Sequence, residues 1–264
     1  MKNETIKRKE EFMTRRTKII CTLGPSTDNE AVMRALIEEG MNVARFNFSH
    51  GPHDEQMGRL KMLRKLRKEL GKYVAALLDT KGPEIRTGAL KDDKKVTLKE
   101  GQKFTLTTRE VIGDETIGHI TYAGLPQDIE AGNTILVDDG LIELKVTKVV
   151  DGTDIECSVV NGGELGSKKG VNVPNVSIKL PGITEKDKDD IIFGIEKGFD
   201  FIAASFVRNA ACIQEIKEIL WAHDADIPVI AKIENAEGIA NIDEIIRVAD
   251  GIMAVSYTHL TLPT

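Results

Sequence analysis

The chain has 264 residues, enough for one large domain or two modest ones. It is 30 % charged and 41 % hydrophobic, which is typical of a globular protein rather than a disordered one. Its formal net charge of -6 argues against a dedicated nucleic-acid binder. No uninterrupted apolar run approaches the roughly 20 residues that span a bilayer, so no membrane segment is expected.

The N-terminus and the cysteines indicate a cytoplasmic protein. The first four residues lead into charge instead of the apolar core of a secretory signal. Cys21, Cys157 and Cys212 lie far apart and form no CxxC pair. We therefore expect reduced cysteines that pack in the interior.

The first part of the chain alternates strands with helices. A capping-box spacing at residues 27–30 predicts a helix that ends at Gly40, and a charged amphipathic helix is expected to end at Gly71. Strands are predicted at residues 18–23, 43–49 and 74–79. Three strand–helix steps with short loops indicate a parallel sheet with right-handed crossovers.

The pattern changes between residues 87 and 180, where no convincing amphipathic helix is found. Turn signals at residues 139–140, 151–152 and 161–163 separate short alternating strands. These strands are predicted at residues 96–98, 104–107, 134–137, 141–150 and 154–160. We expect residues 87–181 to form a small all-β domain inserted into the α/β one.

The strand–helix alternation then returns. Helices are predicted at residues 185–197, 209–222 and 236–249, and strands at 201–207, 228–234 and 251–255. With six strands outside the insert, two fewer than an eight-fold barrel needs, residues 14–86 and 182–255 predict a partial TIM (β/α)8 barrel. Residues 1–13 are expected to form a charged extension, and residues 256–264 show no helical period.

Polar side chains follow the second predicted strand. Arg45, Asn47 and Ser49 share one face of it, because side chains alternate along a strand, while Phe46 and Phe48 take the other. Arg45 suits phosphate or carboxylate, and the oxygens of Asn47 and Ser49 suit a hard cation. The alternative is a strand end whose polar residues are merely solvated.

Charged residues also end the third and fifth predicted strands. Asp79 closes an apolar strand, where an unpaired carboxylate is costly, and a cation or Arg45 would offset that cost. Lys232 and Glu234 lie two apart on one face, a geometry that we judge poor for a direct ion pair. We favour separate roles for them, a cation for phosphoryl or enolate oxygens and a carboxylate for a divalent metal. A Schiff-base lysine and a buried salt bridge are the alternatives.

Two further segments are weaker candidates. Lys169 lies in a glycine-flanked basic loop, which would reach a phosphate only if the insert folds over the barrel mouth as a lid. Ser205 ends the fourth strand among small residues that otherwise suit core packing. The chain contains no GxxxxGK[ST] or GxGxxG motif.

Five segments, in this order, resemble the pyruvate kinase family. They are TKIICTLGPS at residues 17–26, MNVARFNFSHG at 41–51, LDTKGPEIRTG at 78–88, GSKKGVN at 166–172 and AKIEN at 231–235. The resemblance runs from about residue 14 to residue 254. It implies a TIM barrel with an inserted β-barrel lid, a C-terminal regulatory domain and usually a homotetramer. It also implies phosphoryl transfer from phosphoenolpyruvate to ADP, which gives pyruvate and ATP, with Mg²⁺ (or Mn²⁺) and K⁺.

The resemblance also implies roles for single residues. Arg45 is similar to the family's phosphate-binding arginine, and Lys232 to the lysine that stabilises the transferring phosphoryl group and the enolate oxygen. Ser205 is assigned with them to the substrate, and Glu234 to Mg²⁺. The implied K⁺ ligands are Asn47, Ser49, Asp79 and the Thr80 carbonyl. The implied nucleotide contacts are Asn47, His50, Arg86 and Lys169, and Glu84 matches the potassium-dependent branch of the family.

The end of the chain departs from the family pattern. After Met253 the family continues into a Gly-Asp-Leu-Gly-Val-Glu segment with a second Mg²⁺ ligand, whereas here residues 254–257 read Ala-Val-Ser-Tyr. We expect a truncated reading frame with a non-native tail at 256–264 and little or no activity. Two other classes stay open: a metal-dependent barrel lyase acting on phosphoenolpyruvate-like or pyruvate-like acids, and a non-catalytic fragment.

Overall fold

The α/β part of the molecule is built on one parallel sheet. The computed structural model describes residues 16–174, 176 and 178–255; the predicted extension at 1–13 and the predicted tail at 256–264 lie outside them. The sheet has the order β1-β2-β3-β13-β14-β15, and each neighbouring pair is parallel. The strands are β1 (Ile20–Leu23), β2 (Val43–Asn47), β3 (Ala75–Asp79), β13 (Phe201–Ala204), β14 (Val229–Ile233) and β15 (Gly251–Ala254). Six strands in this arrangement confirm the partial barrel.

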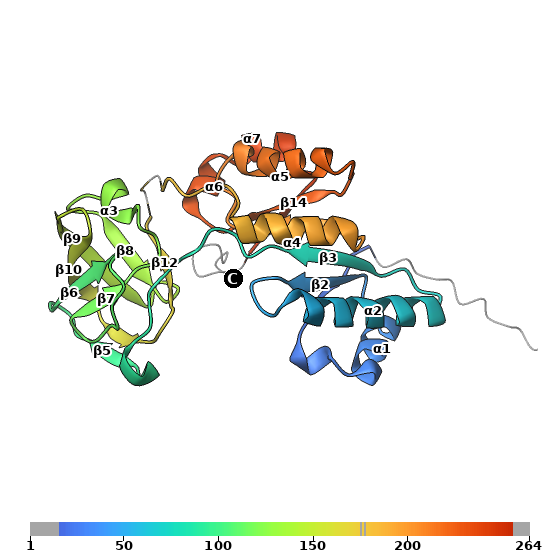
Figure 1. The fold of residues 1–264 in the computed structure, drawn as a ribbon, viewed down its shortest axis with the longest axis horizontal. Coiled ribbons are helices and arrows are strands. Elements are labelled where there is room, and N and C mark those ends of the chain that lie inside the picture. Colours follow the sequence, from blue (N-terminus) through green and yellow to red (C-terminus); the bar gives the residue numbers. More distant parts are fainter. Residues whose placement is uncertain (1–15, 175, 177, 256–264) are drawn as a thin grey trace, which may run out of the picture.

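Helices cover the outward face of this sheet. They are α1 (Glu30–Glu38), α2 (His53–Glu69), α4 (Glu185–Glu196), α5 (Ala210–Ala222), α6 (Ala236–Ala240) and α7 (Ile242–Val248). One apolar cluster joins β1–β3 to α1 and α2, and a second joins β13 and β14 to α4, α5 and α7. Figure 1 shows α1 and α2 beside β2 and β3, and α5 and α7 on the side of β14. The outward side chains fill these clusters, and the polar candidate residues lie on the other face of the strands, at or near their ends.

Two local predictions differ from the structure. Thr27 does not cap α1; it closes a 3₁₀ turn (Pro25–Thr27) in which its hydroxyl bonds both backbone groups of Gly24. Asn29 is the N-cap instead, since its Oδ1 accepts from the Ala31 N–H at 2.8 Å. The helix predicted at 236–249 is broken into α6 and α7 at Asn241, whose side chain bonds the Arg208 carbonyl at 3.0 Å.

The inserted β unit, here called the insert, runs from β4 to β12 and forms a separate body on the left of Figure 1. Its main sheet contains β4 (Ile85–Arg86), β12 (Gly170–Asn172), β8 (Thr134–Val137), β9 (Ile142–Val150), β10 (Asp154–Asn161), β6 (Lys103–Thr107) and β7 (Ile117–His119), in that order. A second pair joins β11 (Gly163–Leu165) to β5 (Val96–Leu98). One short helix, α3 (Leu125–Asp128), and a 3₁₀ turn (Lys91–Asp93) complete it. β4 joins this sheet two residues before the boundary predicted at residue 87.

The insert has its own hydrophobic core, whose members come from its own strands and turns. Cys157 lies in that core, and burial raises the pKa of its thiol to about 12, so the thiol stays protonated at neutral pH. Cys21, Cys157 and Cys212 are free thiols, as expected. Over the described residues, no helix combines the length and the apolarity that crossing a bilayer requires.

Because the insert and the barrel sheet have separate hydrophobic cores, a cavity made in one core should leave the stability of the other unchanged. Leu144 in β9 is fully buried, so Leu144→Ala should lower the stability of the insert by about 2–5 kcal/mol. Hydrogen exchange should show faster exchange of β8–β10 amides and unchanged exchange of β2 and β3 amides. Leu141→Ala, at a position 64 % exposed on the same hairpin, is the matched control. Equal loss in both sheets would contradict two independent cores.

Candidate active site

The C-terminal ends of four neighbouring strands place the candidate residues along one edge of the sheet. β2, β3, β13 and β14 are adjacent, and parallel strands end on the same side. Arg45, Asp79 and Lys232 lie at or near the ends of β2, β3 and β14, and Ser205 follows β13 directly. Phe46 and Phe48 are buried on the opposite, helix-facing side of β2, so the alternation expected for this strand is confirmed.

Asp79 is the centre of this group. Its side chain is 1 % exposed, and Arg45 pairs with its Oδ2. The Lys232 Nζ donates to its Oδ1 at 3.0 Å. Two cations from different strands therefore converge on one buried carboxylate, which offsets the cost of its burial.

Ser205 joins the two sides of the group. Its hydroxyl has one proton, and the Thr80 carbonyl at 2.6 Å is a closer acceptor than Asp79 Oδ1 at 3.2 Å. The Lys232 Nζ donates to the Ser205 Oγ at 2.8 Å, so the hydroxyl is fixed as an acceptor on one side and a donor on the other. The position of the lysine ammonium is consequently held by two oxygens.

Glu234 lies beside Lys232 and is only partly satisfied. Its Oε2 accepts from the backbone N–H of Phe206 at 2.6 Å, whereas its buried Oε1 has no hydrogen-bond partner. Burial raises the pKa of this carboxyl, and the nearby Lys232 charge opposes the shift. The Lys232 Nζ lies 3.3 Å from Oε1, so the expectation that residues two apart on one strand would not pair directly is wrong. Both side chains leave the same face of β14, and the long lysine chain brings its ammonium to both carboxylates.

The Glu234 Oε1 makes no hydrogen bond, and the Lys232 ammonium at 3.3 Å offsets its charge, so this carboxylate can also serve as a ligand for a divalent cation. Among the residues that the structure describes, no group of three or more His, Cys, Asp and Glu side chains is placed to hold a metal.

The loop after β2 carries the remaining barrel candidates. The Phe48 N–H donates to the Asp79 carbonyl at 2.9 Å, which fixes this loop against the end of β3. The Asn47 Oδ1 accepts from the Ser49 N–H at 2.9 Å, and His50 is exposed. Within the described residues, the side chains of Asn47 and Ser49 make no hydrogen bond to Asp79 or Thr80, although Asn47 and Asp79 are register partners.

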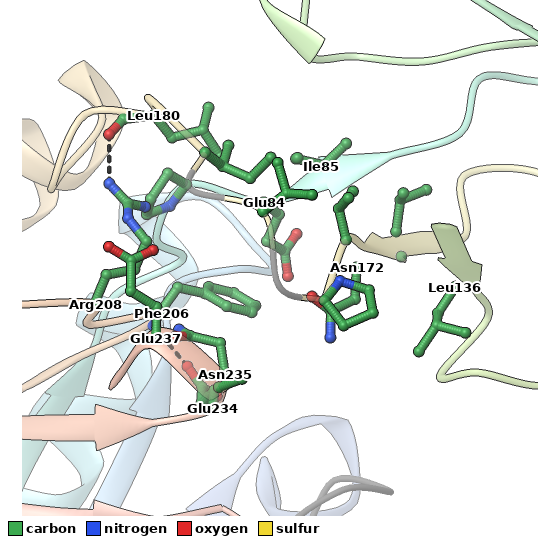
Figure 2. Close-up of a pocket in the computed structure, with 18 of the residues that line it drawn as sticks. Glu84, Ile85, Leu136, Asn172, Leu180, Phe206, Arg208, Glu234, Asn235 and Glu237 are labelled. Atoms are coloured by element: carbon green, nitrogen blue, oxygen red, sulfur yellow. Dashed lines mark hydrogen bonds between the residues drawn. The ribbon is translucent and has the colours of Figure 1, made fainter. Parts of the chain in front are cut away.

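A cavity of about 700 Å³ lies between the insert and the barrel edge. Figure 2 shows Glu84, Ile85, Leu136 and Asn172 facing it from the insert side, and Phe206, Arg208, Asn235 and Glu237 from the barrel side. Of the predicted site residues, Arg86, Lys169 and Glu234 line it. Arg45, Asp79 and Lys232 lie behind Glu234 and do not line the cavity.

The two cations that line the cavity from the insert are already paired with carboxylates. Arg86 bonds Glu84 at 2.6 Å and the Lys168 carbonyl at 2.9 Å, and the Lys169 Nζ lies 3.0 Å from Asp138. An anion entering the cavity would compete with Glu84 and Asp138 for these cations.

Sequence reasoning missed three contributors. Phe206, with a left-handed φ of 56°, turns its N–H toward Glu234, and Arg208 in the cavity wall donates to the Leu180 and Pro181 carbonyls. Asp187 is fully buried and accepts from the Gly82 N–H at 2.9 Å. Only Arg208 had a usable signal, a cation one residue beyond a predicted strand.

Because Asp79 pairs with both Arg45 and Lys232, replacing its carboxylate by an amide should lower the stability of the fold strongly. Asp79→Asn keeps the shape but leaves Arg45 and Lys232 facing a neutral amide, so the free energy of unfolding should fall by about 3–5 kcal/mol in urea titrations. Asp92→Asn, at a side chain 64 % exposed, should change it by less than about 0.5 kcal/mol. A similar small effect at both positions would show that the Asp79 carboxylate is not needed to offset the charges of Arg45 and Lys232.

Gly82 lets the chain approach Ser205 closely, so a side chain at this position should destabilise the fold. Its φ is +72°, and a Cβ there would lie 2.8 Å from the Ser205 Cβ. Gly101 has φ +79° and nothing within 4 Å. Gly101→Ala should therefore cost only the backbone term, about 1–2 kcal/mol, whereas Gly82→Ala should cost at least about 1 kcal/mol more in thermal or chemical unfolding. Equal costs would mean that the contact with Ser205 relaxes freely.

Comparison with known proteins agrees with this geometry. The family model described as "Pyruvate kinase, barrel domain" matches residues 14–258. Pyruvate kinase of Geobacillus stearothermophilus is 53 % identical over 243 residues, which cover 91 % of this chain and 41 % of that protein. Pyruvate kinase of Staphylococcus aureus (strain MRSA252) is 51 % identical over 240 residues, 90 % of this chain and 41 % of that protein. The chain thus spans about two fifths of the length of these curated relatives, and it belongs to the pyruvate kinase family.

Proposed function

We propose that the site serves phosphoryl transfer from phosphoenolpyruvate to ADP, which forms ATP and pyruvate, and that this chain by itself has little or no turnover. The observation that carries this proposal is the convergence of Arg45, Lys232 and the Glu234 carboxylate next to a cavity that two further cations line from the insert. Phosphoryl transfer requires mainly positioning and charge neutralisation, which this set of groups can supply.

In the proposed reaction, the bond between phosphorus and the enol oxygen breaks, and a bond to a terminal ADP oxygen forms. Arg45 binds the phosphoryl oxygens with its planar guanidinium, and Lys232 stabilises the charge on the transferring group and on the enolate oxygen that it leaves. Ser205, whose hydroxyl accepts from the Lys232 ammonium at 2.8 Å, would contact the substrate together with Arg45 and Lys232. The enolate then takes a proton on carbon to give pyruvate.

Two cations are part of the proposal. Glu234 would hold Mg²⁺ (or Mn²⁺), which supplies charge that polarises phosphoryl and enolate oxygens when bound. Asn47, Ser49, Asp79 and the Thr80 carbonyl would hold K⁺, since they offer the oxygen ligands that hard cations prefer. The backbone bond from Phe48 to Asp79 supports this set, because it ties the two contributing strand ends together.

The nucleotide is proposed to bind on the side of the insert. Arg86 and Lys169 would contact its phosphates, with Asn47 and His50 on the barrel side. The salt bridges to Glu84 and Asp138 would then open in exchange for phosphate oxygens. These two cations also argue against a barrel lyase, which has no ADP to bind and would not use them.

Measurements of metal affinity and of substrate affinity test the proposal. Mn²⁺ affinity, followed by electron paramagnetic resonance with phosphoenolpyruvate present, should fall at least about tenfold in Glu234→Gln. Pyruvate formation in a coupled assay with ADP, Mg²⁺ and K⁺ should be little or none, whereas the affinity for phosphoenolpyruvate should fall at least about tenfold in Lys232→Met. Lys217→Met, which removes a surface lysine paired with Asp250, is the control and should match the wild type.

Unchanged Mn²⁺ affinity in Glu234→Gln would remove the metal from this position. Equal phosphoenolpyruvate affinity of the wild type and Lys232→Met would remove the lysine from the substrate site.

A further inference from the structure

The loop that follows β2 has its backbone carbonyls bound by side chains from elsewhere. The Gln56 side chain of α2 is almost fully buried, and its Nε2 donates to the Asn47 carbonyl at 3.1 Å and to the His50 carbonyl at 3.0 Å. One amide group therefore bridges the two ends of the loop. Because this amide is buried, it cannot bond to water instead, and the loss of either acceptor would leave an unsatisfied donor that destabilises the fold.

The middle of the same loop is bound from a different part of the chain. The Lys186 Nζ, in the first turn of α4, donates to the Phe48 carbonyl at 2.9 Å. Its second partner is Asp190, one turn further along α4, whose side chain is 1 % exposed. The buried carboxylate therefore aims the ammonium at the loop.

Asp190 is itself held from α2. The His53 Nε2 lies 2.7 Å from its Oδ1, and the His53 ring stacks on Phe193 of α4 with centroids 4.2 Å apart. The contacts of Asp190 consequently connect the start of α2, the first turns of α4 and the loop between β2 and α2.

We propose that Gln56, Lys186 and Asp190, here called the carbonyl clamp, are positioning residues for Asn47, Ser49 and His50. Three carbonyls, at positions 47, 48 and 50, are fixed by two donors, which restricts how the loop can present its side chains to a cation or a nucleotide. This inference rests on the proposed function for what the loop binds, but the clamp itself is a property of the described contacts. Simple packing does not explain it, since an apolar side chain would fill the place of Gln56 without a bond to the backbone.

Hydrogen exchange of the whole chain tests the clamp directly. The reporters are the Phe48 amide, bonded to the Asp79 carbonyl, and the Ser49 amide, bonded to the Asn47 Oδ1. In tetramethylammonium chloride, Lys186→Met and Gln56→Met should each exchange these amides at least about tenfold faster, a loss of about 1.4 kcal/mol of local protection. Amides of β3 and of the rest of α4 should keep their rates.

Two variants make the result specific. Lys188→Met is the matched control, because Lys188 lies on the same helix with comparable exposure and pairs only with Glu185 among the described residues. Lys186→Arg keeps a donor for both the Phe48 carbonyl and Asp190, and it should restore most of the protection. Unchanged loop rates in both methionine variants would overturn the clamp, and so would a loss spread evenly over α4 and β3.

A second arm, in KCl at the same ionic strength, separates the clamp from the proposed cation site. If K⁺ binds at the loop, it should slow the reporter amides in the wild type and in Lys186→Arg, and much less in the methionine variants. No response of the wild type to K⁺ would count against the cation site alone. The tetramethylammonium arm would still decide the clamp.

Discussion

The architecture of the barrel edge depends on one buried carboxylate. Asp79 lies at the end of β3 with Arg45 arriving from β2 and Lys232 from β14, and each of these groups would be costly to bury alone. The parallel register makes the meeting possible, because it aligns the strand ends to within a residue or two. The apolar layers under the helices hold that register, so the stability of the core and the geometry of the site are linked.

Among the described residues around Asp79, one buried side-chain oxygen, the Glu234 Oε1, lacks a hydrogen bond. Thr80, Ser205, Lys232 and Asp79 satisfy one another by hydrogen bonds, whereas the buried Glu234 Oε1 has only an ion pair with Lys232 at 3.3 Å among the described residues. The site therefore combines a hydrogen-bonded interior with one buried carboxylate oxygen that an ion pair alone offsets. It holds its cations in place before a ligand arrives, which lowers the cost of reorganisation when negative charge enters.

Periodicity and strand-end chemistry predicted much of this from the sequence. Apolar runs bounded by glycine and proline predicted the six strands, and the alternation around Arg45 predicted which side chains face inward. The Lys232–Glu234 contact could not be predicted, because it depends on how a flexible lysine chain bends between two carboxylates. The break at Asn241 and the cap at Asn29 were missed for a related reason: each depends on a bond to a specific backbone group that spacing alone does not reveal.

The insert is attached to the barrel through two short crossings that lie close to each other. The outgoing chain packs Gly82 against Ser205 and Phe206, and the returning chain is held where Arg208 bonds the Leu180 and Pro181 carbonyls. The insert has its own core, and the chain enters and leaves it at neighbouring points, as is typical of a domain inserted into a surface loop. Protein engineers could exchange it for another module, or for a short linker, without rerouting the strands beneath.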